Sequence, residues 1–259
     1  MTRVVASIEA RMSSSRLPGK VLTDINGVPA LSRLLRRLKL CTRIDDIVLA
    51  TSTNPADDKV AEWAESEDLS YYRGSEENVL QRVVDAHIYM NSEIVVEVTG
   101  DCILSDPGLI DMTILTFFEN NADVVSSISK RGFPMGAGAQ VFRFKDLEYV
   151  CRTIDDSAVR EHVSLYFYEN PELYRVIYLM PPPMWFKPEW RFQIDYPEDL
   201  EFTKEIYKRL EPIHGDAFTI QDIVEVCRKE PNLPKINSFR SERPARMEHD
   251  TPSMDNNKL

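Results

Sequence analysis

The first half of the chain alternates short apolar runs with longer stretches in which apolar residues recur at helical spacing. The apolar runs, which are typical of buried strands, are 4–8, 47–51, 69–72 and 94–98. The stretches with helical spacing are 29–40, 55–67 and 76–90, and Pro29 stands at the expected first helical position. Strands that alternate with helices predict βαβ units, and therefore a mainly parallel sheet with helices on both faces.

The second half of the chain keeps these two patterns at less regular intervals. Helical patterns cover 107–120, 157–170, 197–210 and 219–229, and strand-like runs cover 122–127, 140–144 and 191–195. A glycine-rich elbow at 132–138 and a proline loop at 181–183 interrupt them. We expect one α/β domain over 1–236 with a Rossmann-like, doubly wound, mixed but mostly parallel sheet. An insert at about 128–188 would act as a lid or in dimerisation, and 237–259 would be a disordered tail.

Composition and charge narrow the class of protein. The net charge of −11 argues against a binding surface for nucleic acid or for an anionic membrane. No apolar run approaches the roughly 20 residues needed to cross a bilayer, and the first residues enter a strand without a secretory segment. The four cysteines are widely spaced, as is typical of reduced thiols, so we expect a cytoplasmic protein. Residues 1–40 nevertheless hold eight Lys and Arg against two acids, which indicates a small anionic ligand.

The loop at 10–20 follows the first predicted strand, where ligands of doubly wound sheets bind. Arg11 and Arg16 can each bind two phosphate oxygens, Lys20 adds a mobile positive charge, and the small residues between them let backbone N–H groups approach an anion. The Walker pattern of glycines and lysine is absent. The loop therefore favours a triphosphate, with an ordinary solvated loop as the alternative.

Two aspartates, Asp101 and Asp195, each follow a predicted strand. Mg²⁺ binds to one or two carboxylates together with phosphate oxygens and water, and it stabilises the charge that develops during phosphoryl transfer. Either aspartate alone is more typical of a turn or a helix cap. Their common placement at strand ends, with a phosphate loop upstream, favours metal-assisted nucleotidyl transfer.

These motifs and others in the same order resemble the cytidylyltransferase superfamily, whose members make CMP-sialic acid, CMP-Kdo and related CMP-sugar acids. The branch of spore-coat-polysaccharide SpsF-type proteins is the most similar. The resemblance covers residues 3–210 and rests first on 8–20, Ile-Glu-Ala-Arg-Met-Ser-Ser-Ser-Arg-Leu-Pro-Gly-Lys. The further matching segments are 50–52, 57–58, 72–75, 78–80, 99–102, 106–107, 160–163, 191–195 and 197–199.

The resemblance implies a homodimeric enzyme that uses CTP and Mg²⁺ to convert a small anionic acceptor into its CMP derivative, with release of pyrophosphate. The implied catalytic residues are Arg11, Lys20, Asp101 and Asp195, of which the two aspartates hold the metal. The implied nucleotide-binding residues are Ala10, Arg11, Met12, Ser13, Arg16, Lys20, Arg73, Gly74, Ser75, Asn78, Arg82 and Thr99. The implied acceptor-binding residues are Gln140, Arg160, Glu161 and His162.

Structural roles remain open for some of these residues. Ser75 can instead be the N-cap of the helix that follows it. A single histidine on a helix, such as His162, is more often structural than catalytic.

Four residues depart from what SpsF-type chains commonly have. Glu9 replaces a glutamine, Glu97 an arginine, Gln140 a glutamate and Met135 an arginine. The loss of arginine and the gain of glutamate predict an acceptor that is less anionic than a typical nonulosonate, or one that is held differently. Glu9 can also accept a hydrogen bond from the amino group of cytosine or from guanine, which leaves the base open.

Two alternative functions also fit parts of the sequence. A glycosyltransferase that uses a nucleotide-sugar would combine a similar fold with an Asp-x-Asp motif, but Gly100-Asp101-Cys102 lacks that spacing. A degenerate relative that only binds nucleotide would be consistent with the departures at Glu97, Met135 and Gln140.

Overall fold

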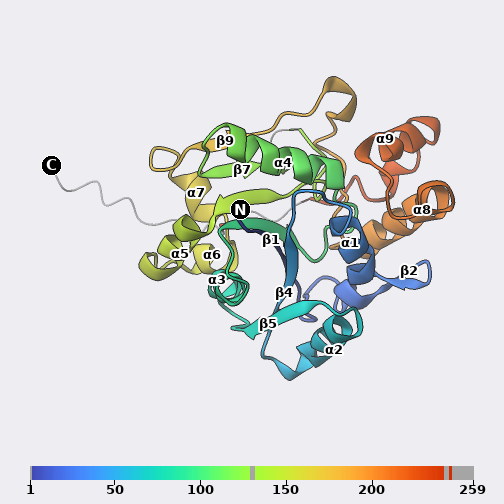
Figure 1. Ribbon diagram of the computed structural model, residues 1–259. Coiled ribbons are helices and arrows are strands. Elements are labelled where there is room, and N and C mark those ends of the chain that lie inside the picture. Colours follow the sequence, from blue (N-terminus) through green and yellow to red (C-terminus); the bar gives the residue numbers. More distant parts are fainter. Residues whose placement is uncertain (1, 129–131, 242–244, 247–259) are drawn as a thin grey trace.

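The computed structural model describes residues 2–128, 132–241 and 245–246, and its main feature is a seven-stranded sheet (Figure 1). The strand order is β5-β4-β1-β6-β8-β7-β9. The strand bounds are Val4–Glu9 (β1), Asp46–Ser52 (β4), Ser70–Gly74 (β5), Ile94–Thr99 (β6), Val124–Ser126 (β7), Gln140–Arg143 (β8) and Val176–Tyr178 (β9). Strands β5, β4, β1 and β6 are parallel, β8 is antiparallel to β6 and β7, and β9 is parallel to β7.

Helices cover both faces of the sheet, as the alternation of patterns predicts. One face carries α1 (Ala30–Leu38), α2 (Asp58–Ser66), α4 (Pro107–Glu119), α8 (Pro197–His214) and α9 (Ile220–Lys229). The other carries α3 (Val79–Tyr89), α5 (Phe144–Thr153), α6 (Ser157–Glu161) and α7 (Leu165–Glu169). In Figure 1 these two groups lie on opposite sides of the strands. The Rossmann-like, doubly wound fold is therefore confirmed.

Burial on both faces explains why the central strands are continuous apolar runs. In β1, Val4, Ala6 and Ile8 pack with the first group of helices, and Val5 packs with the second. Both cores are close-packed against the same strands, so the carboxyl end of β1 is held in a fixed position under the loop that follows it.

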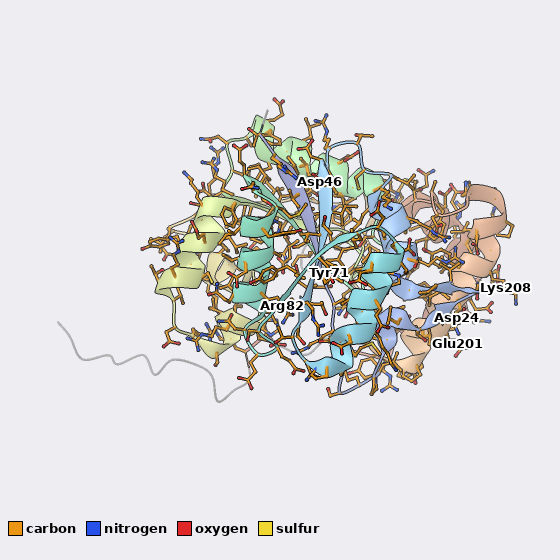
Figure 2. The ribbon with its side chains drawn as sticks, turned by 60° about the horizontal axis from the view of Figure 1, so that its bottom comes forward. Asp24, Asp46, Tyr71, Arg82, Glu201 and Lys208 are labelled. Atoms are coloured by element: carbon orange, nitrogen blue, oxygen red, sulfur yellow. The ribbon has the colours of Figure 1, made fainter. Side chains whose placement is uncertain are left out.

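Short elements fill the connections between the main layers. Strands β2 (Asp24–Ile25) and β3 (Val28–Pro29) form a hairpin, and in Figure 2 Asp24 lies beside Glu201 of α8. Single 3₁₀ turns occur at η1 (Lys20–Leu22), η2 (Pro55–Asp57), η4 (Pro183–Trp185) and η5 (Pro234–Ile236). Pro29 precedes α1 as its N-cap instead of opening it at the first helical position.

The strand predicted at 191–195 is wrong. Its residues form only an isolated bridge between Met135 and Arg191, together with single backbone hydrogen bonds from Phe192 N–H to Met135 O and from Ile194 N–H to Asp101 O. The side chain of Asp199 accepts hydrogen bonds from the next backbone N–H groups, and the chain turns into α8 instead of joining the sheet.

The single helix predicted at 157–170 is also wrong, because α6 and α7 are separated at residues 162–164. His162 has extended backbone angles and ends α6. Helix α5, strand β9 and the β2–β3 hairpin were not predicted at all.

The segment at 128–188 contributes β8 and β9 to the main sheet. Its role as a lid or in dimerisation stays a prediction. Asn237, where the polar tail was expected to begin, is buried and donates hydrogen bonds to Arg191 O and to Asp199. Residues 242–244 and 247–259 of that tail lie outside the described residues. No helix in the described ranges is both long enough and apolar enough to span a membrane.

Candidate active site

A cleft of about 760 Å³ opens at the carboxyl ends of β1 and β6. It brings together twelve of the residues predicted for the site, namely Ala10, Arg11, Ser13, Arg16, Lys20, Arg82, Thr99, Asp101, Gln140, Glu161, His162 and Asp195. Those that do not line it are Met12, Arg73, Gly74, Ser75, Asn78 and Arg160. The loop, both aspartates and most of the acceptor residues therefore share one space.

The loop at 10–20 folds back on itself and is held in place by hydrogen bonds within the loop and to Asp57. Gly19 has a φ of 72°, a left-handed conformation that favours glycine, and its N–H donates to Met12 O at 3.0 Å. The N–H of Met12 donates to Asp57 Oδ1 at 2.6 Å, and Asp57 also accepts from the Ser52 hydroxyl. Asp57 thus fixes the start of the loop, a role that its place in a sequence motif did not reveal.

Gly100 allows the ends of β1 and β6 to come close together. A Cβ atom there would lie 2.9 Å from both Ala10 Cβ and Glu9 O, closer than such atoms approach in practice. The N–H of Gly100 donates to Glu9 O at 2.8 Å. Asp101 is thereby placed directly beside the loop.

Lys20 joins the two predicted metal-binding aspartates. Its Nζ donates to a carboxylate oxygen of Asp101 and, at 2.8 Å, to Asp195 Oδ1. Arg16 contacts the same Asp195 oxygen at 2.5 Å. Burial alone would lower the pKa of Lys20, but the attraction of Asp101 and then of Asp195 outweighs it and raises that pKa. Burial alone would raise the pKa of Asp195, but the attraction of Lys20 and then of Arg16 outweighs it and lowers that pKa. Both groups are charged at neutral pH.

The chemistry of this pair of carboxylates fits a magnesium ion. Asp101 and Asp195 both reach one cationic nitrogen, so both can reach one cation. Among the described residues, no group of three or more His, Cys, Asp or Glu side chains is placed to hold a metal ion. A metal at this position would take its remaining ligands from phosphate oxygens and water, as Mg²⁺ commonly does.

Asp199, which was not predicted as a site residue, sets the position of Asp195. It accepts hydrogen bonds from the N–H groups of Asp195 and Tyr196 at 2.9 and 3.0 Å. It also accepts from Arg191 Nε at 3.1 Å. Asp199 is therefore a positioning residue, and only its place in the segment 197–199 gave a signal in the sequence.

Arg11 reaches across the cleft from the loop to α6. Its guanidinium donates to Glu76 O and to Glu161 Oε1, both at 3.0 Å. The Ser13 hydroxyl donates to Glu76 Oε1 at 2.8 Å, which ties the loop to the turn before α3. Arg82, which Figure 2 labels on α3, donates to Ser75 O.

The predicted nucleotide-binding residues of the turn between β5 and α3 lie outside the cleft. Arg73 donates to Ser52 O and Asn54 O and forms an ion pair with Asp58 at 2.7 Å. Asn78, and not Ser75, is the N-cap of α3. Their contact with a base stays a prediction.

The predicted acceptor residues are divided between the cleft and the surface. Gln140, Glu161 and His162 line the cleft. Arg160 is 47% exposed and pairs with Asp155 at 2.7 Å, so it does not reach the cleft in this conformation.

Two further carboxyl groups line the cleft, on β1 and β6. The Ser7 hydroxyl donates to Glu9 Oε1 at 2.9 Å, and Gln140 Nε2 donates to Glu97 Oε2 at 3.0 Å. Burial, and then the nearby charge of Glu97, raises the pKa of Glu9 well above its usual range. Burial raises the pKa of Glu97 to about 8. All four residues that differ from SpsF-type chains, Glu9, Glu97, Met135 and Gln140, therefore line the same cleft.

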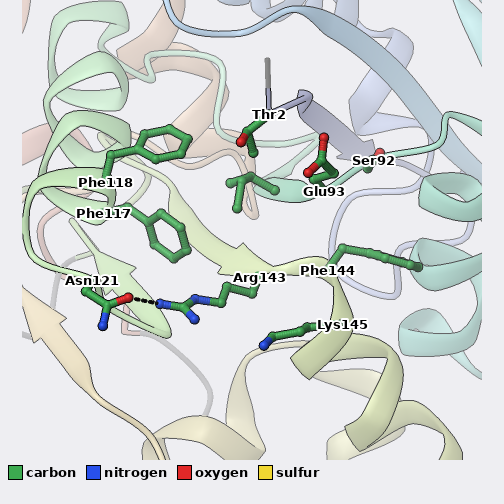
Figure 3. Close-up of a pocket in the computed structure, with 10 residues that line it drawn as sticks. Thr2, Ser92, Glu93, Phe117, Phe118, Asn121, Arg143, Phe144 and Lys145 are labelled. Carbon is green, nitrogen blue, oxygen red and sulfur yellow. Dashed lines mark hydrogen bonds between the residues drawn. The ribbon is translucent and has the colours of Figure 1, made fainter.

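A second hollow, of about 420 Å³, lies at the opposite end of the central strands, near the amino ends of β1 and β6 (Figure 3). Phe117 and Phe118 line it, together with Arg143, which donates to Asn121 Oδ1 at 2.6 Å. Its lining includes none of the residues predicted for the site.

Comparison with known proteins agrees with this geometry. A family model described as cytidylyltransferase matches residues 5–223. The chain is 34% identical over 236 residues to an uncharacterised protein of Methanocaldococcus jannaschii, covering 91% of this chain and 95% of that protein. It is 32% identical over 215 residues to the spore coat polysaccharide biosynthesis protein SpsF of Bacillus subtilis, covering 81% and 88%.

Solved structures show the same fold. A cytidylyltransferase from Leptospira borgpetersenii matches with a TM-score of 0.85 and 28% identity, covering 94% of this chain and all of that one. A CMP-2-keto-3-deoxy-manno-octonic acid synthetase in complex with CTP matches with a TM-score of 0.62 and 16% identity, covering 80% and 99%. Family model, relatives and fold agree that this chain belongs to the cytidylyltransferase family and is a nucleotidyltransferase.

Proposed function

We propose that this enzyme transfers the CMP group of CTP to an oxyanion of a small acceptor, with Mg²⁺ as the metal. The observation that carries the proposal is the cluster of Lys20, Arg16, Asp101 and Asp195 at the floor of the cleft. It combines cations for a triphosphate with two carboxylates for a metal in a single contact network. Such a cluster suits nucleotidyl transfer, which needs positioning and charge stabilisation more than covalent help from the protein.

The reaction follows from these charges. An acceptor oxyanion attacks the α-phosphorus of CTP, the bond from that phosphorus to the bridging oxygen breaks, and pyrophosphate leaves with the electron pair. Arg11, Arg16 and Lys20 bind phosphate oxygens and stabilise the negative charge of the leaving group. Asp101 and Asp195 would hold Mg²⁺, which supplies further neutralisation of the phosphate charge when bound.

Substrate binding requires an exchange of partners within the cluster. Lys20 and Arg16 are paired with aspartates in the structure described here. A triphosphate would draw both cations toward its oxygens, while the metal takes their place on the carboxylates. The pairing therefore keeps the cluster neutral and ordered until CTP and metal arrive together.

The names of relatives support a sugar-derived acceptor. SpsF of Bacillus subtilis is named for the biosynthesis of spore coat polysaccharide, and several further relatives are named 3-deoxy-manno-octulosonate cytidylyltransferases. We propose a sugar acid or a related anionic compound as the acceptor in this chain, and a cytoplasmic location for the reaction.

We also propose that the enzyme is a homodimer. Four large apolar side chains are exposed within a short stretch of the chain, Leu173, Met180, Met184 and Phe186. Clustered exposed apolar residues mark interaction surfaces, so size-exclusion chromatography with light scattering should give twice the chain mass.

Pyrophosphate release tests the transfer reaction. CTP, ATP, GTP and UTP should be assayed with Mg²⁺ against a panel of sugar acids, sugar phosphates and phosphonates. CTP should support turnover with at least one acceptor, and Asp101→Asn and Asp195→Asn should each lose almost all of it. The exposed acid Glu62 offers a matched control, because Glu62→Gln should keep full activity. Turnover that survives in both aspartate variants would contradict the proposal.

A further inference from the structure

The floor of the cleft carries two acidic side chains on neighbouring strands. Ser7 of β1 is in register with Glu97 of β6, and Glu9 is in register with Thr99. Because side chains at paired positions of adjacent strands point to the same face, all four lie on one side of the sheet. Glu9 and Glu97 are therefore diagonal neighbours, and both line the cleft.

Each of these carboxyl groups has one oxygen fixed by a neutral donor. Glu97 is 7% exposed and accepts a hydrogen bond from Gln140 Nε2 through Oε2. Glu9 accepts one from the Ser7 hydroxyl through Oε1. Within the described residues, neither forms a salt bridge, and each keeps a second oxygen without a hydrogen-bond partner.

The other acids of the cleft are placed differently. Asp101 and Asp195 are paired with Lys20, and Glu161 is paired with Arg11. The positive charge of Arg82 lowers the pKa of Glu9. The Arg82 side chain is buried, however, and its guanidinium donates hydrogen bonds to the carbonyl oxygens of Ser75 and Glu76. Buried carboxyl groups ordinarily have a cation or several donors, so Glu97 lacks the partner that its burial calls for, and the half-buried Glu9 beside it has no ion pair among the described residues.

The position of Glu97 in the sheet separates it from the expected nucleoside site. The turn after β5, where the base is expected, lies at one edge of the sheet, and strands β4 and β1 lie between it and β6. Glu97 contacts Gln140 of β8, and the Tyr168 hydroxyl of α7 donates to the Gln140 side-chain oxygen. His162, which follows α6, also lines the cleft. Glu97 therefore belongs to the acceptor side.

We propose that Glu97, together with Glu9, binds a protonated amino group of the acceptor. The acceptor class would then be zwitterionic, with an oxyanion that attacks the α-phosphorus and an ammonium group that selects the molecule. This inference rests on the proposed function, since it assigns one substituent of the acceptor of that reaction. An ammonium donates up to three hydrogen bonds, and the pair offers two open carboxylate oxygens to receive them.

The raised pKa of both groups is consistent with this arrangement. Burial raises the pKa of Glu97 to about 8, so the pair holds a proton when no ligand is present. An ammonium ion would supply the missing positive charge and favour the ionised form of both carboxyl groups.

Matched acceptors test the subsite by binding and by turnover. The pairs are glucosamine 6-phosphate with N-acetylglucosamine 6-phosphate, and 3-aminopropylphosphonate with butylphosphonate. In each pair the oxyanion is kept, and the neutral partner carries an acetamido or a methyl group where the amine carries its ammonium, so the second pair is matched in size. Calorimetry on the full chain loaded with Mg²⁺ and a non-hydrolysable CTP analogue gives affinities, and pyrophosphate release from CTP gives turnover.

The wild type should bind at least one amine member about tenfold tighter than its neutral partner, and Glu97→Gln should abolish that preference. Glu9→Gln should reduce it, and Glu62→Gln should preserve it. Stabilisation of each variant by CTP and Mg²⁺ shows that it is folded.

The outcomes separate the two proposals. Three results would overturn the ammonium subsite. The wild type could bind both amines no more tightly than their neutral partners, or the preference for the amine could survive in Glu97→Gln. The third is no binding of any of the four compounds at 10 mM, ~100 times a typical KM. An amine preference lost in Glu97→Gln, but with no pyrophosphate formed from any nucleotide, would support the subsite and contradict the transfer reaction. Pyrophosphate formed at equal rates with the amines and with their neutral partners would support the transfer reaction and contradict the ammonium subsite.

Discussion

Single side chains in this molecule act mainly by fixing backbone and by placing charge. Lys20 and Asp101 could be predicted as a group, because Lys20 lies in the basic loop after β1, Asp101 follows β6, and the carboxyl ends of parallel strands meet. Asp195 was included for a strand at 191–195 that does not form, and it is held beside Asp101 by the hydrogen bond from Ile194 N–H to Asp101 O. Asp57 and Asp199 could not be assigned in the same way. Their function depends on backbone N–H groups that only the folded chain brings to them.

Asp57 gives the first prediction. Asp57→Ala removes the acceptor that holds the Met12 N–H and the Ser52 hydroxyl, so the start of the phosphate loop should become mobile. We expect the KM for CTP to rise about tenfold or more, since misplaced positioning groups weaken binding and catalysis together. Steady-state pyrophosphate release measures this change, with Glu62→Ala as the control. An unchanged KM in a folded variant would show that Asp57 does not anchor the loop.

Glu97 gives a prediction about pH. Burial raises its pKa to about 8 in the folded chain, above the 4.5 of a free glutamate, so folding favours the protonated form. The contribution of Glu97 to the free energy of unfolding should be largest below pH 4.5 and should fall as pH rises to 8, by an amount on the order of a few kcal/mol. Glu9, whose pKa is also raised, adds a change of the same sign, and the positive charge of Arg82 opposes that change.

Glu97→Gln isolates this contribution. The melting temperature of the variant relative to the wild type should increase steadily between pH 5 and pH 8, because glutamine carries no charge to bury. A difference between the two that stays constant over this range would mean that Glu97 does not titrate in the folded protein.

Whole elements show where local sequence patterns are overruled. The alternation at 191–195 is typical of a strand, but the segment finds no strand partner and is instead turned by Asp199 at the start of α8. The hairpin at Asp24–Pro29 was missed although Asn26 and Gly27, both with positive φ, form a typical two-residue turn. Helix α5 was missed because it begins directly at the end of β8.

The turn before α8 carries the next prediction. Asp199→Asn removes the charge that pairs with Arg191 and weakens the acceptor for the Asp195 N–H. We expect both lower stability, by about 3 kcal/mol as for broken buried pairs, and a fall in kcat/KM of at least tenfold. Denaturant unfolding and pyrophosphate release measure the two effects. Glu198→Gln, one position earlier on the same helix, should change neither by much. A loss of stability without any loss in kcat/KM would limit Asp199 to a structural role.

At the scale of the molecule, the order of strands explains why distant residues meet. The sheet places β1 between β4 and β6, so the phosphate loop after β1 lies beside Asp101 after β6. This part of the topology follows from alternating strands and helices. The position of β8 beside β6 could not be predicted, because a short strand pattern indicates neither the direction of the strand nor the strand with which it pairs. This antiparallel strand brings Gln140 to Glu97.

The central claim is that one cluster of Lys20, Asp101 and Asp195 binds CTP and metal together, and thermal unfolding with CTP and Mg²⁺ tests it without knowledge of the acceptor. The wild type should be stabilised by about 2.7 kcal/mol at a hundred times the Kd for CTP. Asp101→Asn should fold and should lose most of that stabilisation. A folded wild type whose melting is unchanged by CTP with Mg²⁺, or an Asp101→Asn variant that is stabilised equally, would contradict the account.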